Sequence, residues 1–358
     1  MKMIRRLFLV FLVLVMLTGC RSATAVVVDR TRKESVISVI PLNDSIIYYY
    51  ESLKDSTMNY KMLGIERLYF DGRTVSLGMV KGSSIQMRAL IGNQVFIGTS
   101  TWEDGSYVYT VDLSADQMTS EHLGEDYLLE LVAFGGYLIR HRMDRDTLGS
   151  ERLELEMYDP EAGEVVKVFD VHSVVPNSFF LHDMCVSGEY LYLWLTDRDT
   201  DEASLLKLNQ DLEPAGTVDI STVTNLMSQY DYADVRTFEI YDDFIFVSVD
   251  GSPKSIIGTL KNDAIVDAQE IDPVYALLQC DSSSPVFTNY KRKELFFIDE
   301  KTNQLISKEI PLRDGFAASN IEKFGDKIII FAHPTKKETM KESRKCYVTD
   351  RKFSGLPE

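Results

Sequence analysis

Residues 184–220 read MCVSGEYLYLWLTDRDTDEASLLKLNQDLEPAGTVDI, and this stretch decides the fold. The aromatic and aliphatic run Tyr190 to Leu195 follows a tight turn at Gly188-Glu189, which predicts a hairpin of two strands. A second hairpin is predicted from Leu205 to Ile220, around the polar turn Asn209-Gln210-Asp211. Because two consecutive hairpins make one four-stranded sheet, the stretch predicts a complete antiparallel β-unit.

Both hairpins recur along the chain. The first kind joins two apolar strands through a tight Gly or Asp turn, and it recurs at Met87–Thr99, Leu129–Arg140, Phe238–Val249 and Ile321–Phe331. The second kind has a polar turn, and it recurs at Tyr107–Leu123, Leu153–Val171, Ile256–Ile271 and Leu295–Ile310, with an early copy at Asp71-Gly72 and a truncated one at Thr349-Asp350. The turns return about every 40 to 50 residues, which is the period of a repeat architecture.

A four-stranded unit repeated at this period predicts an all-β fold, a β-propeller of seven blades, with six as the alternative count. Parallel β-helices repeat faster, and sandwiches do not repeat in this way. The last unit ends too soon for a fourth strand, and we expect Val36–Ile40 to supply it and so close the ring. The propeller domain is thus predicted to span residues 35–358, with one short helix, Val223–Tyr232, in a connection.

The N-terminus has the pattern of a signal peptide. Lys2, Arg5 and Arg6 precede an apolar run from Leu7 to Leu17, which is too short to cross a bilayer core of about 30 Å comfortably. The segment Leu17-Thr18-Gly19-Cys20 resembles the lipobox of bacterial lipoproteins. The resemblance implies cleavage after residue 19, lipidation of Cys20, and a tether over residues 20–34. It also implies anchoring to the extracytoplasmic face of a membrane in a bacterial cell envelope.

Charge argues against a nucleic-acid partner. The net charge of −17 would become −20 after loss of the three basic residues of the signal segment, and a polyanion would be repelled. The densest basic cluster (Lys336, Lys337, Lys341, Arg344 and Lys345) is interrupted by Glu338 and Glu342 and is interpreted as a solvated loop. Cys185, Cys280 and Cys346 lack CxxC spacing and are interpreted as buried thiols, although a single disulfide stays open.

No catalytic, cofactor-binding or metal residue can be assigned from motifs. The five histidines are scattered (His122, His141, His172, His182 and His333), and His182-Asp183, the one His beside a carboxylate, should point to opposite sides of a strand. Asp197, Asp199 and Asp201 resemble the start of a calcium loop, but Glu202 replaces its glycine and Leu208 its final glutamate. Aromatic residues in connections could form a sugar-stacking rim: Trp102, Tyr127, Phe179, Phe180, Tyr230, Tyr232 and Phe316.

These observations favour a membrane-anchored propeller that binds or scaffolds a protein, peptide or glycan partner in the envelope. The alternative is a carbohydrate-active hydrolase or lyase that uses carboxylates near the centre of the ring, since propellers host both classes. A third reading is an accessory subunit of an envelope complex, for which we would expect an exposed apolar patch on one blade or face.

Overall fold

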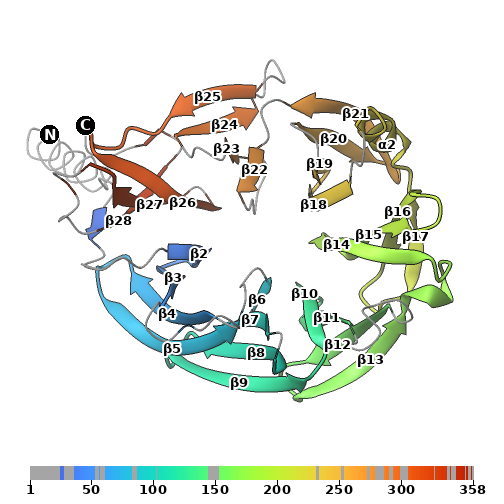
Figure 1. Cartoon of the computed structure of the whole chain (residues 1–358), viewed down its shortest axis with the longest axis horizontal. Helices are drawn as coiled ribbons and strands as arrows, with labels where there is room; N and C mark the ends of the chain where they lie inside the picture. The colour runs from blue at the N-terminus through green and yellow to red at the C-terminus, as the bar shows by residue number, and fades with distance from the viewer. Residues whose placement is uncertain are drawn as a thin grey trace, which may run out of the picture.

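The structure is a computed structural model in which seven four-stranded antiparallel sheets form a ring (Figure 1). It describes residues 25–27, 36–52, 56, 61–82, 87–101, 103–143, 153–230, 234–250, 254–271, 275–278, 286–289, 293–298, 305–325, 327–336, 339, 344–350, 352–353 and 356. The count of seven blades is confirmed, and the alternative of six is wrong. The signal segment 1–19 and Cys20 lie outside the described residues.

The blades are numbered here in chain order. Blade 1 holds β2 (Val36–Pro41), β3 (Ser45–Glu51), β4 (Lys61–Tyr69) and β5 (Thr74–Gly82). Blade 2 holds β6 (Met87–Ile91), β7 (Gln94–Thr101), β8 (Gly105–Asp112) and β9 (Gln117–Gly124), and blade 3 holds β10 (Tyr127–Phe134), β11 (Tyr137–Met143), β12 (Glu154–Asp159) and β13 (Glu164–Asp170). Blade 4 holds β14 (Phe179–Ser187), β15 (Tyr190–Asp197), β16 (Ala203–Leu208) and β17 (Pro214–Val218).

The remaining three blades complete the ring. Blade 5 holds β18 (Asp234–Tyr241), β19 (Phe244–Asp250), β20 (Ser255–Lys261) and β21 (Ala264–Ile271). Blade 6 holds β22 (Tyr275–Leu278), β23 (Val286–Asn289), β24 (Glu294–Ile298) and β25 (Leu305–Glu309). Blade 7 holds β26 (Phe316–Phe324), β27 (Lys327–Pro334), β28 (Lys345–Thr349) and β1 (Ala25–Val27).

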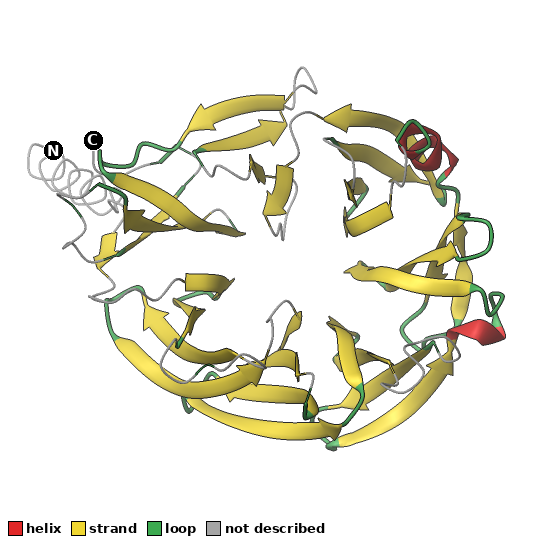
Figure 2. Ribbon diagram, viewed as in Figure 1, coloured by secondary structure: helices red, strands yellow, loops and turns green. Residues whose placement is uncertain are grey.

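In blades 1 to 6 the chain runs from the centre of the ring outward (Figure 1), and Figure 2 shows that strands make up most of the ring. The predicted turns join the strands: Ser187 pairs with Tyr190 across Gly188-Glu189, and Leu208 pairs with Pro214 across the polar turn. Gly188 has a φ of +57°, a left-handed conformation that glycine adopts without strain and that suits a tight hairpin. The repeat read from the sequence is therefore the repeat of the blades.

The strand that closes the ring is not the one predicted. Ala25–Val27 pairs antiparallel with β28 as the fourth strand of blade 7, from Ala25 opposite Tyr347 to Val27 opposite Lys345. Val36–Pro41 is instead the innermost strand of blade 1, paired with β3. A largely apolar strand suits a position at the centre of the ring, where neighbouring blades cover both faces, whereas an outer edge needs only a short strand. Closure by an N-terminal strand is confirmed, but this strand lies within the segment predicted as a tether.

Apolar side chains fill the spaces between adjacent blades. Trp194 of blade 4 is fully buried and lies against Phe238 of blade 5, with their ring centroids 5.6 Å apart. The short predicted helix exists as α2 (Ser221–Met227) in the connection between these blades, where Val223 and Met227 are buried. Helix α2 packs beside β21, and a 3-10 turn, η1 (Val171–Ser173), follows β13.

Two of the three predicted buried thiols can be checked. Cys185 in β14 and Cys346 in β28 are buried and free, as predicted, while Cys280 lies outside the described residues. Within the residues that the structure describes, no helix has both the length and the apolar character needed to span a bilayer.

Candidate functional site

A β-bulge interrupts the pairing of five innermost strands. The register shifts between Val36 and Ser38 in β2, Leu128 and Glu130 in β10, Leu181 and Asp183 in β14, Val235 and Thr237 in β18, and Ala318 and Asn320 in β26. In every case the residue that resumes pairing is polar. Bulges re-aim side chains and are common beside functional sites, so these five inner strands each carry a polar residue directly after a bulge.

Asp183 connects the inner strands of blades 4 and 5. Its Oδ2 atom accepts a hydrogen bond from the Phe238 amide at 2.9 Å, and its Oδ1 atom accepts one from the Met184 amide at 2.9 Å. Burial raises the pKa of Asp183, and the bond from Phe238 opposes part of that rise. The carboxyl group is therefore held between two blades, where its charge is costly.

Two glutamates flank Asp183 on the neighbouring inner strands. Burial, with a contribution from the charge of Asp183, raises the pKa of Glu130 to about 8 and that of Glu239 to about 7. Tyr241 donates a hydrogen bond to Glu239 Oε2 at 3.1 Å. All three carboxyl groups are only partly exposed. At neutral pH, Glu130 is thus mostly protonated and can donate as well as accept a hydrogen bond.

The opposite part of the inner wall carries an ion pair. Arg88 of β6 lies 3.6 Å from Glu322 Oε2 of β26, and its Nη1 atom donates to the Val39 carbonyl of β2. The Arg88 guanidinium also interacts electrostatically with the carboxylate of Glu239. We call Arg88, Glu130, Asp183, Glu239 and Glu322 the inner-ring set. It joins blades 2, 3, 4, 5 and 7, and it can bind a ligand through both acidic and basic groups.

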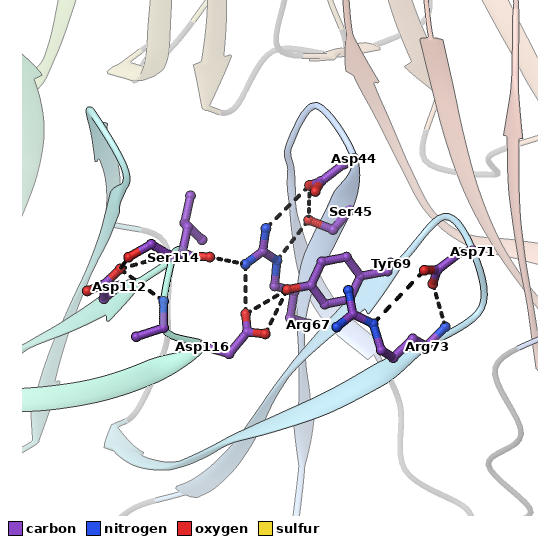
Figure 3. A network of polar contacts seen from close by, with 11 residues as sticks. Asp44, Ser45, Arg67, Tyr69, Asp71, Arg73, Asp112, Ser114 and Asp116 are labelled. Atoms are coloured by element: carbon purple, nitrogen blue, oxygen red, sulfur yellow. Dashed lines mark hydrogen bonds and ion pairs between the residues drawn. The ribbon is translucent and has the colours of Figure 1, made fainter.

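Polar contacts from the third strand of one blade to an outer turn of the next hold neighbouring blades in place, and Figure 3 shows one such network. The buried Arg67 guanidinium of β4 reaches blade 2, where Nη1 donates to Asp116 Oδ1 at 2.7 Å and to the Leu113 carbonyl at 2.5 Å. Its Nε atom donates to Ser45 Oγ at 2.9 Å, and Tyr69 donates to Asp116 Oδ2 at 2.7 Å. The contacts fix blade 1 against blade 2.

The same kind of contact recurs between blades 4 and 5. Lys207 Nζ of β16 lies 2.5 Å from Asp263 Oδ1, in the outer turn of the next blade. Asp116 and Asp263 both have positive φ, at +52° and +56°, in corresponding turns. We call each pair an inter-blade clasp. The clasps hold neighbouring blades together and so stabilise the blades that carry the inner-ring set.

The candidate residues identified from sequence motifs lie outside the inner-ring set, except for Asp183. Asp197 Oδ1 accepts the Asp199 amide at 2.8 Å, which is an ordinary turn contact, and the described part of the chain holds no group of three or more His, Cys, Asp or Glu arranged to bind a metal. The His182 ring packs against the Phe180 ring in a tilted arrangement, with the centroids 4.3 Å apart, while its neighbour Asp183 belongs to the inner-ring set. In the basic cluster, Lys336 pairs with Asp314 on the surface, whereas Lys345 is the first residue of β28 and not part of a loop, and Lys337 and Lys341 lie outside the described residues.

The proposed aromatic rim is not assembled as a single feature. Tyr127 and Phe316 are buried, Phe179 and Phe180 are half-buried neighbours in β14, Tyr230 is half-buried in the connection after α2, and Trp102 and Tyr232 lie outside the described residues. The other inner-ring residues were missed by motif searching. Their signal in the sequence is a polar residue within an apolar inner strand, a few positions before the tight turn, repeated from blade to blade.

The fold and its inner wall define the chain as a seven-bladed β-propeller. The sequence matches no known family model and no curated protein. Among solved structures, it is similar to the β-propeller domain of Cps50 (Swd1) from Myceliophteria thermophila, with 10% identity over 90% of this chain and 99% of that one, and a TM-score of 0.54.

Two further solved structures have the same fold. The β-propeller domain of the Trilobed protease from Pyrococcus furiosus, described as having an open velcro topology, has 12% identity over 89% of this chain and 94% of that one, with a TM-score of 0.56. The acylaminoacyl peptidase of Pyrococcus horikoshii has 12% identity over 85% of this chain and 50% of its own, with a TM-score of 0.54. At these identities the likeness concerns the fold alone.

Proposed function

We propose that the chain is a lipid-anchored propeller of a bacterial cell envelope that binds a protein, peptide or glycan partner at the centre of its ring. The observation that carries this proposal is the inner-ring set, which brings partly exposed polar side chains from five blades to one inner wall. Ligand sites are commonly built from a few convergent polar groups on a rigid frame.

The chemistry of these groups fits a ligand rich in hydrogen-bonding groups. Glu130, when protonated, offers a donor, while Asp183 and Glu239 offer acceptors. Arg88 presents a planar set of N–H donors beside Glu322. Backbone amides, ammonium groups and sugar hydroxyls can all satisfy such a mixed set.

Binding at the inner wall is tested by partner capture with a matched variant. We expect the wild-type protein to retain an envelope partner that the double variant Asp183→Asn, Glu239→Gln loses, while the exposed-turn control Glu161→Gln keeps it. Circular dichroism and thermal melting check that the double variant is folded. If a folded double variant captures the same partner to the same extent, the inner wall is not the binding site.

Anchoring is proposed from the lipobox resemblance alone, since Cys20 lies outside the described residues. Two or more acyl chains bind a membrane firmly, because each buried methylene contributes about 0.8 kcal/mol. Metabolic labelling with a fatty acid should label the wild type and a Cys185→Ala control, and Cys20→Ala should be unlabelled and released from membranes. Label that persists in Cys20→Ala would contradict the proposal.

A second candidate function is glycoside cleavage, as a hydrolase or lyase. The specific observation in its favour is Glu130, whose pKa of about 8 keeps it protonated beside the charged Asp183 on the adjacent inner strand. A protonated and an ionised carboxyl group are the two partners that acid–base cleavage of a glycosidic bond needs. Turnover of labelled envelope glycans that Glu130→Gln abolishes, without loss of glycan binding, would establish the enzyme and displace the pure binder.

A further inference from the structure

The outer edge of blade 3 is unusually apolar. Of the eight large hydrophobic side chains that the described part of the chain leaves exposed, four fall between residues 165 and 174. Val165, Val166 and Val168 of β13 are 43%, 47% and 50% exposed, and Val174 follows just after the strand. Most soluble proteins avoid such a run on an edge strand, because unpaired backbone groups and apolar side chains together invite another strand.

The register of β13 places Val165 and Val168 on one side of the sheet. Val168 lies opposite Glu156 and Val165 lies opposite Tyr158, with a bulge at Val166 between them. Directly opposed residues of an antiparallel pair share a face, so Val165 and Val168 project on the same side despite their spacing. The bulge thus places Val165 and Val168 on the same face of the sheet, although regular alternation would place them on opposite faces.

Three other blades have outer edges that are covered by a helix, closed by β1 or polar. Helix α2 packs beside β21, and β1 pairs with β28. β9, with the sequence QMTSEHLG, carries mostly exposed polar side chains. Within the described residues, β12 is the one strand paired with β13. Among the described strands, none pairs with the backbone groups on the outer side of β13.

The charged residues around the outer edge of β13 indicate which kind of partner can bind there. Lysine usually discourages pairing at an edge, but Lys167 Nζ reaches away to the Asp211 carbonyl of blade 4. Glu161, Glu164 and Asp170 are exposed at the ends of β13. A second copy of the chain fits poorly, because symmetric antiparallel pairing about Lys167 would set Glu164 opposite Asp170 and Lys167 opposite Lys167.

We propose that the outer edge of β13 binds an extended segment of a partner protein in which apolar and cationic residues alternate, as an added antiparallel strand. The apolar residues contact the valines, and the cationic residues meet the acidic ends of β13. The molecule already takes up a strand in this way where β1 pairs with β28. This surface is separate from the inner-ring set and goes beyond the function proposed for it.

The probe is a capped peptide of alternating Val and Lys, seven residues long, titrated by fluorescence anisotropy against the full chain. We expect the double variant Val165→Thr, Val168→Thr to bind the peptide about fivefold to tenfold more weakly. Each substitution removes a methyl group that the bound peptide would bury, worth up to about 0.8 kcal/mol. Threonine keeps the strand propensity of valine. The control Ile306→Thr, on the exposed outer strand of blade 6, should bind like the wild type.

Three outcomes would overturn the proposal. They are equal binding by a peptide N-methylated on alternate amides, equal binding by an oligolysine of the same charge, and a dimer in sedimentation that the valine variants abolish. Equal binding by the N-methylated peptide would show that backbone pairing is not needed. Equal binding by oligolysine would show that charge alone explains the binding, and the dimer would identify a second copy as the occupant. The double variant Asp183→Asn, Glu239→Gln should bind the peptide normally, which separates this test from that of the inner ring.

Discussion

Glu130 should make the protein less stable as the pH rises through neutrality, and removing its charge should abolish that loss. Burial raises the pKa of Glu130 from 4.5 to about 8, so the folded state favours the protonated form. The associated stability is fully present below pH 4.5, where the carboxyl group is protonated in both states, and it is lost progressively up to about pH 8. The variant Glu130→Gln keeps a neutral side chain of similar shape at every pH.

The size of the expected stability change follows from the pKa of Glu130. At about 1.4 kcal/mol per pH unit, the rise corresponds to roughly 5 kcal/mol if it is converted in full. Glu130 is partly exposed, and solvent screening reduces this figure. We therefore expect Glu130→Gln to be about 2 kcal/mol more stable than the wild type at pH 8.5. We also expect the wild type to lose about 1 kcal/mol more than the variant between pH 6.5 and 8.5.

Urea unfolding at 25 °C, followed by tryptophan fluorescence at half-unit steps from pH 6.5 to 8.5, measures both quantities. Glu161→Gln removes the same charge from an exposed turn and controls for the general repulsion of an acidic chain. Parallel stability curves for the wild type and Glu130→Gln would refute the reasoning. The same result would remove the main support for Glu130 as a proton donor.

Three further predictions follow from the frame and the closure of the ring. Asp116→Asn keeps a residue that tolerates the left-handed turn but leaves the buried Arg67 with one ion pair, the 3.3 Å contact to the exposed Asp44, so unfolding should cost about 1 kcal/mol less, while the exposed-turn control Glu161→Gln should change stability little; chemical denaturation compares them. Burial lowers the pKa of His141 to about 4, so its ring should stay neutral at pH 5.5 by NMR, and a protonated ring at that pH would be incompatible with the packing described. Deleting Ala25–Val27 should lower the melting temperature by several degrees by exposing the edge of β28, and an unchanged melting curve would mean that β1 does not close the ring.

The blades could be predicted from the sequence because each is built from local hairpins. Gly188-Glu189 and Asn209-Gln210-Asp211 specify turns within a few residues of the strands that they join. The closing strand could not be predicted in the same way. Ala25–Val27 has three residues and pairs with residues near the other end of the chain, whereas Val36–Ile40 is longer and has the same apolar character.

The inner-ring set was missed for a different reason. Alternation along a strand suggested that His182 and Asp183 lie on opposite faces and have no common role. The bulge at that point interrupts the alternation, and only the pairing of β14 with β15 reveals it. The Arg67–Asp116 clasp joins residues of two different blades, so no local pattern of residues marks it.

The short strand β1 also has a mechanical consequence. Ala25 lies five residue steps after Cys20, a reach of at most about 18 Å. If Cys20 carries the proposed lipid, any pull between membrane and partner passes through Ala25–Val27 and its few backbone hydrogen bonds to β28. The strand that closes the ring would then be the first to yield under load. A force on the anchor would open blade 7 before it disturbed the inner wall.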